Sequence, residues 1–183
     1  MGTLSDLASR PPAGGFSDVS DLIRTLNLIK TRRDLAWLTV SQREALTALQ
    51  EALRVPGTVN LFGATGVGKT FLAWTLADEL GYMYFPHLDH FERVEDLHTT
   101  GIVLDNCHPD RRTHRHTLKA LSFQNVRYAV LITRQMIRDY THYVELALTP
   151  ADQAKAWDNL ANLGIFREAR ELPNLWHVVN PYL

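Results

Sequence analysis

The chain has 183 residues, 45% of them hydrophobic, and a formal net charge of -1. This size and apolar content fit one ordinary globular domain, which needs no disulfide or metal to hold it together. The near-neutral charge excludes a strong overall field toward nucleic acid or membrane, and the single cysteine excludes an internal disulfide. No apolar run approaches the length of a membrane-spanning helix, and the first residues lack the apolar core of a secretory signal. We therefore expect a cytoplasmic protein.

The N-terminal part is predicted to be a flexible segment followed by helices. Residues 1–15 end in a Pro- and Gly-rich stretch, which is typical of a flexible segment. Residues 16–57 are expected to form helices that pack on the core. Apolar residues recur at helical spacing inside residues 16–38. Ser41 and Glu44 then form the S-x-x-E capping pattern, which predicts the start of a second helix.

Apolar segments alternate with helical segments in residues 58–183, which we expect to form the core of the fold. Strands are expected at 58–62, 82–85, 101–104, 127–133 and 143–148. One helix should begin inside the Gly-rich loop, one lie near 117–122, and one start after Thr149 with Pro150 in its first turn. Residues 175–179 are predicted as a last edge strand. The alternation predicts an α/β fold with a mostly parallel sheet that is covered by helices on both faces.

A complete phosphate-binding motif follows the first strand. Residues 63–70 read G-A-T-G-V-G-K-T and match G-x-x-x-x-G-K-[ST] in full. The glycines let successive backbone N–H groups face inward, and the next helix points its positive end at the same place, so the loop is suited to phosphate oxygens. The predicted nucleotide-binding residues are Gly63, Ala64, Thr65, Gly66, Val67, Gly68, Lys69, Thr70, Phe71 and Thr133. Lys69 is expected to neutralise phosphate charge, and Thr70 to bind Mg²⁺ beside ATP.

An acidic residue ends the third predicted strand. Asp105 follows three apolar residues, and a carboxylate at this position can hold Mg²⁺ directly or through water. The next residue is Asn106, which cannot take a proton from water at neutral pH. Asn106 can still orient water by hydrogen bonding. We therefore expect slow hydrolysis, unless Asp110 or a partner chain supplies a base.

The fourth predicted strand ends in Thr133 and Arg134. If this strand lies between the loop strand and the acidic strand, its tip points at the γ-phosphate. Arg134 could then distinguish a triphosphate from a diphosphate by a charge-assisted contact. The alternatives are a surface arginine after a buried strand, and a threonine that caps the next helix.

Four other sets of residues have structural interpretations that we favour over functional ones. Arg111, Arg112, His114, Arg115 and His116 form a basic run, interpreted as a solvated loop and helix start rather than an arginine finger or a phosphate contact. The spacing of His87, His90, His98 and His108 matches no zinc pattern. Cys107 is predicted to be a buried small residue. The four tryptophans are interpreted as packing residues, and the sequence does not say which of them could stack on an adenine.

The motif strings together resemble the STAND class of signal-transduction ATPases, which are relatives of the AAA+ machines. The phosphate loop fits the class. The string V-L-D-N-C at 103–107 is similar to its acidic-strand motif, and L-I-T-R at 131–134 is similar to its sensor strand. Residues 144–150 resemble the segment that closes the core ATPase fold. The resemblance covers residues 40–163. It implies a three-layer P-loop NTPase fold, with residues 58–183 as the nucleotide-binding core and a mostly parallel five-stranded sheet of order 5-1-4-3-2.

The resemblance implies roles for single residues and for the whole module. It gives Lys69, Thr70, Asp105 and Arg134 the phosphate, magnesium and sensor roles. The chain departs from the class at His108, where a glutamate is common, and it has no counterpart of the helical and winged-helix domains. The expectation is therefore a nucleotide-dependent switch or slow ATPase that works with a partner protein or by self-assembly, with no membrane contact.

Two other functions stay open at the level of the sequence. The length would suit a P-loop small-molecule kinase, although no acceptor-site carboxylate pair is evident. Residues 68–73 also resemble the ATPases that load replication or transposition proteins onto DNA. Net charge gives no support for a DNA-binding surface.

Overall fold

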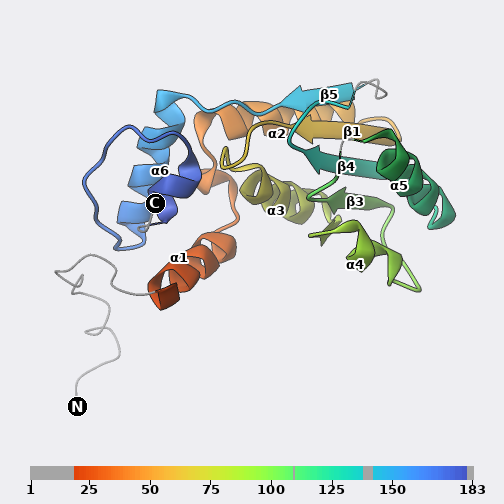
Figure 1. Cartoon of the computed structure of the whole chain (residues 1–183), viewed down its shortest axis with the longest axis horizontal. Coiled ribbons are helices and arrows are strands. Elements are labelled where there is room, and N and C mark those ends of the chain that lie inside the picture. Colours follow the sequence, from red (N-terminus) through yellow and green to blue (C-terminus); the bar gives the residue numbers. More distant parts are fainter. Residues whose placement is uncertain (1–18, 109, 138–141, 181–183) are drawn as a thin grey trace, which may run out of the picture.

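The computed structural model describes residues 19–108, 110–137 and 142–180 (Figure 1). The segment 1–15, predicted to be flexible, lies outside them. The helices are α1 (Val19–Thr31), the 3-10 turn η2 (Leu35–Trp37), α2 (Val40–Ala52), α3 (Lys69–Leu80), α4 (Leu88–Glu92), α5 (Arg111–Phe123), α6 (Pro150–Asn162) and α7 (Leu175–Val179). The strands are β1 (Gly57–Phe62), β2 (Met83–Phe85), β3 (Gly101–Leu104), β4 (Tyr128–Thr133) and β5 (His142–Glu145).

The strands form one parallel sheet in the order β2-β3-β4-β1-β5. This is the predicted order 5-1-4-3-2 read from the other edge, and the predicted fold class is confirmed. The strand β4 lies between the loop strand β1 and the acidic strand β3. The register pairs Phe62 with Thr133, so β1 and β4 end at the same level. The polar residues that follow these strands therefore meet at one edge.

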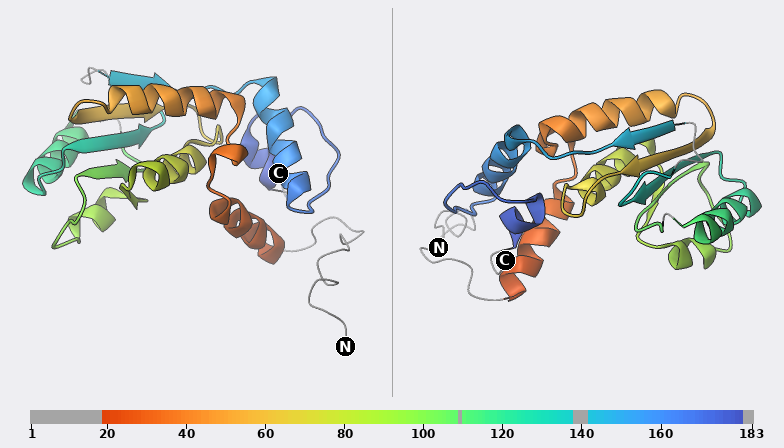
Figure 2. Two further views of the ribbon diagram at one scale, coloured as in Figure 1. Left: turned by 180° about the vertical axis from the view of Figure 1, so that it is seen from behind. Right: turned by 45° about the horizontal axis from the view of Figure 1, so that its top comes forward.

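Helices cover both faces of the sheet. Successive side chains of each strand point to opposite faces, and because the central strands are mostly apolar, both faces have to be buried. One face packs against α2 and α3, and contains Val59, Val103 and Val130. The opposite face packs against α4 and α5, and contains Ile102 and Leu131. The helices α6 and α7 form a smaller apolar cluster with α1, next to the end of the sheet at which the phosphate loop lies (Figure 2).

The N-cap of the second helix lies two residues before the predicted cap. Thr39 is the N-cap of α2, and its capping-box partner is Gln42, so the prediction of Ser41 and Glu44 is wrong. The reason is a long-range contact. The backbone N–H and hydroxyl of Ser41 both donate to the Asp152 carboxylate, at 2.8 Å each. The S-x-x-E pattern is therefore present in the sequence but lies inside the first turn of the helix.

Two further elements differ from the predictions. The helix α5 begins at Arg111 rather than near residue 117, because the Asp110 carboxylate caps it by accepting from the Thr113 N–H at 2.9 Å. Residues 175–179 form the helix α7 and not an edge strand, because Asn174 caps it and its Val178 is buried against α6. The predicted start of α6 is confirmed, with Thr149 as its cap and Pro150 in its first turn. Within the described ranges, no helix has the length and apolar character needed to span a bilayer.

Candidate functional site

The loop of residues 63–70 connects β1 to α3, as the motif requires. Gly66 and Gly68 have φ angles of 83° and 89°, in the region that favours glycine. A Cβ atom on Gly66 would lie 2.6 Å from the side chain of Asn174, and one on Gly68 would collide with Gln42. These glycines are therefore required both by the turn and by the segments packed against it.

Two segments outside the motif hold the loop. Gln42 in α2 donates its side-chain N–H to the Gly68 carbonyl at 2.9 Å, and the Leu175 N–H in α7 donates to the Gly66 carbonyl at 2.8 Å. Gln42 is 2% exposed. The position of Gln42, three residues after Thr39, predicts a capping contact. Nothing in the local sequence predicts the contact of Gln42 with the loop. The sequence analysis missed both loop contacts, because they join segments that are distant along the chain.

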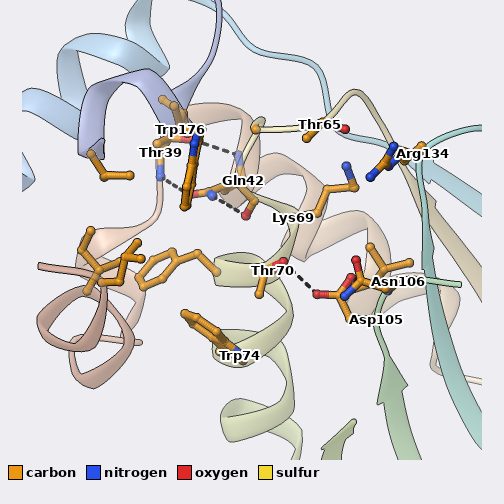
Figure 3. Close-up of a pocket in the computed structure, with 18 of the residues that line it drawn as sticks. Thr39, Gln42, Thr65, Lys69, Thr70, Trp74, Asp105, Asn106, Arg134 and Trp176 are labelled. Carbon is orange, nitrogen blue, oxygen red and sulfur yellow. Dashed lines mark hydrogen bonds between the residues drawn. The ribbon is translucent and has the colours of Figure 1, made fainter. Parts of the chain in front are cut away.

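Lys69 lies at the first position of α3 with its ammonium turned toward the loop. It donates to the carbonyls of Gly63 and Ala64 at 2.6 and 2.7 Å. Burial lowers the pKa of Lys69, Asp105 acts in the opposite direction, and Arg134 adds to the lowering. Lys69 and Arg134 lie side by side at the same end of the site (Figure 3). A second cation near the ammonium makes this end attractive to an anion.

Asp105 is the polar centre of the site and is 4% exposed. One of its carboxylate oxygens accepts from the Thr70 hydroxyl at 2.7 Å and from the Tyr84 hydroxyl at 3.0 Å, and the other accepts from the Asn106 N–H at 2.7 Å (Figure 3). Burial and the Asp105 charge raise the pKa of Tyr84. The structure therefore brings the two predicted magnesium ligands into contact. It also adds Tyr84, which the sequence analysis missed.

The residues after Asp105 turn sharply away from β3. Asn106 has a φ angle of 52°, and its side-chain amide donates to the Pro86 carbonyl at 3.1 Å. Burial raises the pKa of the Cys107 thiol to about 12, so this cysteine is not a poised nucleophile. The Cys107 N–H donates to the Ile132 carbonyl at 2.9 Å. That bond connects the turn after β3 to the end of β4.

The end of β4 is held by a buried amide that the sequence analysis did not single out. Asn60 in β1 is fully buried and donates to the Leu131 carbonyl at 3.0 Å and to the Thr133 hydroxyl at 2.9 Å. Its carbonyl oxygen accepts from the Ile137 N–H at 2.8 Å. We call these contacts the Asn60 network. They fix both ends of the segment that carries Arg134.

The two predicted residues at this strand end have different environments. Thr133 is 2% exposed, and its hydroxyl donates to the Gln135 carbonyl at 2.6 Å. Thr133 therefore shapes the turn after β4, and residues 134–137, which are described before the gap at 138–141, form no helix that Thr133 could cap. Arg134 is exposed. Its side chain lies next to Lys69 at the open end of the site (Figure 3).

A cavity of about 840 Å³ joins these residues to an aromatic compartment. Its polar end contains Lys69, Thr70, Asp105, Asn106 and Arg134. Its apolar end is lined by side chains from α1, η2, α3 and α7: Leu26, Ile29, Trp37, Phe71, Trp74, Leu175, Trp176 and Val179. Figure 3 shows Trp176 and Trp74 on opposite sides of this space.

Of the predicted loop residues, Val67 is 6% exposed and belongs to the core, so only its backbone is free for phosphate.

The candidate residues Cys107, His87 and His108 also line this cavity, whereas the described side chains of the basic run and Asp110 do not. Of the basic run, Arg112, Arg115 and His116 line a separate surface depression on α5, and the side chain of Arg111 lies outside the described part of the structure. Asp110 caps α5, and its hydrogen bonds with Thr113 lower its pKa. Within the described ranges, no three His, Cys, Asp or Glu side chains are grouped so that they could hold a metal ion.

Comparisons with known proteins place the chain near one group of solved structures. No family model and no curated protein matches it. A replication initiator DnaA bound to AMPPCP and single-stranded DNA is 15% identical with a TM-score of 0.43, over 74% of this chain and 53% of that chain. AMPPCP-bound DnaA from Aquifex aeolicus is 14% identical with a TM-score of 0.45, over 72% and 55%. A DNA replication initiation factor is 16% identical with a TM-score of 0.43, over 92% and 57%.

The matched region of this chain thus corresponds to little more than half the length of each of these proteins. At such identities and TM-scores the comparisons carry no argument about function. The resemblance to the STAND class continues to depend on the motif strings alone.

Proposed function

We propose that this protein is an ATP-binding module of the AAA+ or STAND kind, which acts as a nucleotide-dependent switch or slow ATPase within an assembly. One observation carries the proposal. The Thr70 hydroxyl of a complete phosphate loop lies 2.7 Å from the Asp105 carboxylate of the neighbouring acidic strand end. In a nucleotide site of this type, those two groups are the ones that meet at the magnesium ion.

Phosphate binding is assigned to the loop and two cations. The loop of residues 63–70 leads into the N-terminal end of α3, where partial positive charge accumulates. Lys69 and Arg134 add full positive charges at the same end. The Lys69 ammonium now donates to two loop carbonyls, and phosphate oxygens would compete with those carbonyls for it.

Magnesium fits the oxygen groups beside the loop. Mg²⁺ prefers hard oxygen ligands and is usually held by one or two protein groups together with substrate phosphates. Thr70 and Asp105 provide a hydroxyl and a carboxylate already in contact, and Tyr84 orients the same carboxylate. When bound, the ion would neutralise charge on the β- and γ-phosphates.

Slow hydrolysis is supported by the groups available to activate water. Among the described residues that line the cavity, Asp105 is the one with a carboxylate, and it is assigned to magnesium. The Asn106 side-chain amide donates to Pro86, and Asp110 caps α5. His87 and His108 also line the cavity and are the remaining groups there that could accept a proton. A site with these groups is better suited to hold ATP than to cleave it.

The aromatic end of the cavity is assigned to the nucleobase. Trp176 and Trp74 both line this end of the cavity, and base stacking on an aromatic ring contributes about 1–3 kcal/mol. This assignment connects the base to α7, whose Leu175 also holds the phosphate loop. A bound nucleotide would therefore contact both the loop and the C-terminal helix, as a switch requires.

Calorimetric titration with ATP and Mg²⁺ tests the proposal. Lys69→Ala and Thr70→Ala should each weaken binding about ten-fold or more, since each removes a charge-assisted contact or a metal ligand. Lys155→Ala on α6 is the matched control and should leave affinity unchanged. Wild-type protein that binds no nucleoside triphosphate at millimolar concentration would refute the proposal.

Phosphate release and molecular mass separate a switch from other activities. We expect slow release and an increase in mass by light scattering when ATP is added. Asn106→Ala should slow release further. Fast turnover that survives Asn106→Ala would refute the account of the water-activating position. Phosphate transfer to a small acceptor would instead identify a kinase.

A further inference from the structure

The outer face of α5 has a concentrated positive charge. Arg112, Arg115, His116 and Lys119 are all exposed and line one shallow surface depression. Their spacing of three, four and seven residues places them on one side of the helix. The opposite side is buried in the core through residues such as Leu121. The helix contains no acidic residue. The nearby Glu92 of α4 contacts His116 at 2.7 Å, and among the described residues no carboxylate forms an ion pair with Arg112, Arg115 or Lys119.

An exposed aromatic ring continues this basic face. Phe123 lies four residues after Lys119, so it is on the same side of α5. It is 86% exposed, more than any other large hydrophobic residue of the described chain. A phenylalanine at such a position adds nothing to the core. Its open ring faces suit a flat partner that can stack.

We propose that the α5 face, defined as Arg112, Arg115, His116, Lys119 and Phe123, binds single-stranded nucleic acid. The arginines and the lysine would contact successive phosphates, and an unpaired base would stack on Phe123. Cationic grooves with aromatic platforms bind single strands in this way without sequence preference. A duplex would keep its bases stacked on one another and could not use the phenylalanine ring.

The length of the face fits this partner. Arg112 and Phe123 are eleven residues apart in α5, which is about 16 Å along a helix axis. Successive nucleotides of one strand are separated by about 3.4 Å in a stacked arrangement, so the face spans about five of them. The net charge of -1 does not oppose this proposal, because the attraction depends on local charge.

The α5 face is separate from the nucleotide cavity but close to it along the chain. Asp110 caps α5 and is five residues after Asp105. The two sites can therefore be tested separately, and the proposal does not depend on ATP binding.

Fluorescence anisotropy with a labelled 20-nucleotide oligo-dT tests the proposal on the full chain. The variant Arg112→Ala/Arg115→Ala/Lys119→Ala should bind about ten-fold or more weakly and reduce the slope of log affinity against log salt by about 2, since each phosphate contact contributes about 0.7. A matched control is Arg24→Ala/Arg32→Ala/Arg43→Ala, which removes three exposed arginines from α1, α2 and the turn between them, and should leave binding unchanged. Both variants remove the same net charge.

The Phe123 variants distinguish nucleic acid from an acidic protein partner. Phe123→Ala should weaken oligo-dT binding about five-fold to a hundred-fold, and Phe123→Trp should restore it. Binding to polyglutamate of equal charge should be weak and unaffected by either change. Equal losses in the two triple variants would overturn the proposal. So would an oligo-dT affinity that Phe123→Ala does not change, or equally tight binding of polyglutamate. In every case, ATP titration of the same variants should remain normal.

Discussion

Replacing Asn60 by leucine should both destabilise the protein and disable Arg134. Leucine has nearly the shape of asparagine but makes no hydrogen bond. The change removes the three bonds of the Asn60 network, which measure 2.8, 2.9 and 3.0 Å. It leaves the Ile137 N–H, on a residue 5% exposed, without its recorded partner. A buried polar group left without a partner costs about 1–3 kcal/mol.

The expected loss of unfolding free energy is therefore about 2–4 kcal/mol, since Thr133 also loses a donor but keeps its bond to Gln135. For a chain of this size the melting temperature should fall by roughly 5–15 °C. Urea unfolding monitored by circular dichroism measures the free energy directly. Thr133→Val is a milder variant of the same network and should cost about 1–2 kcal/mol.

The functional consequence can be measured as a coupling between Asn60 and Arg134. Arg134→Ala alone should weaken ATP binding about ten-fold to a hundred-fold, as expected for a charge-assisted contact. In the Asn60→Leu background, the same change should cost less than about three-fold, because the segment that positions Arg134 is no longer fixed. The affinities should be measured at a temperature at which every variant is folded. Equal penalties in both backgrounds, or an unchanged unfolding free energy for Asn60→Leu, would refute the reasoning.

Three further predictions concern other parts of the site and its support. Burial raises the pKa of Asp152, but hydrogen bonds from Thr149 and Ser41 outweigh it and hold the pKa below its ordinary value. The contribution of the Asp152 carboxylate to the free energy of unfolding is therefore fully present above the unfolded pKa, near 3.9. It is lost as the pH falls through the folded pKa. Asp152→Asn should cost about 2–4 kcal/mol in urea unfolding at pH 7 and remove this acid-dependent part, and an identical pH profile for variant and wild type would contradict the assignment. Gly66→Ala should weaken ATP binding and lower the melting temperature, because the φ angle of 83° is strained for alanine and its Cβ meets a neighbouring side chain at 2.6 Å; wild-type values for both would contradict the close approach. Cys107, with its pKa raised to about 12, should react with iodoacetamide at pH 8 about a hundred-fold or more slowly than a free cysteine, and fast labelling of folded protein would contradict its burial.

The sequence by itself determined the elements whose signals are local. The phosphate loop is contiguous, and the apolar segments around it predicted the parallel sheet, whereas the strand order came from the resemblance to a known class. The contact of Thr70 with Asp105 followed from that order, because parallel strands bring their carboxyl ends to one edge. The start of α6 at Thr149 was also correct, since a cap followed by proline is a signal contained in a few residues.

The tertiary structure decided everything that depends on partners far along the chain. Ser41 and Asp152 are 111 residues apart, and Ser41 contacts Asp152 instead of capping α2. The capping pattern of Ser41 and Glu44 was therefore misleading. Asn60 reaches residues 71 to 77 positions away, so no local pattern could mark it. Residues 175–179 are too short for periodicity to separate strand from helix, and their packing against α6 and the phosphate loop settled it. The chemistry of the loop was thus predictable from a few consecutive residues. The residues that hold the loop were not, because they lie on segments that only the folded chain brings together.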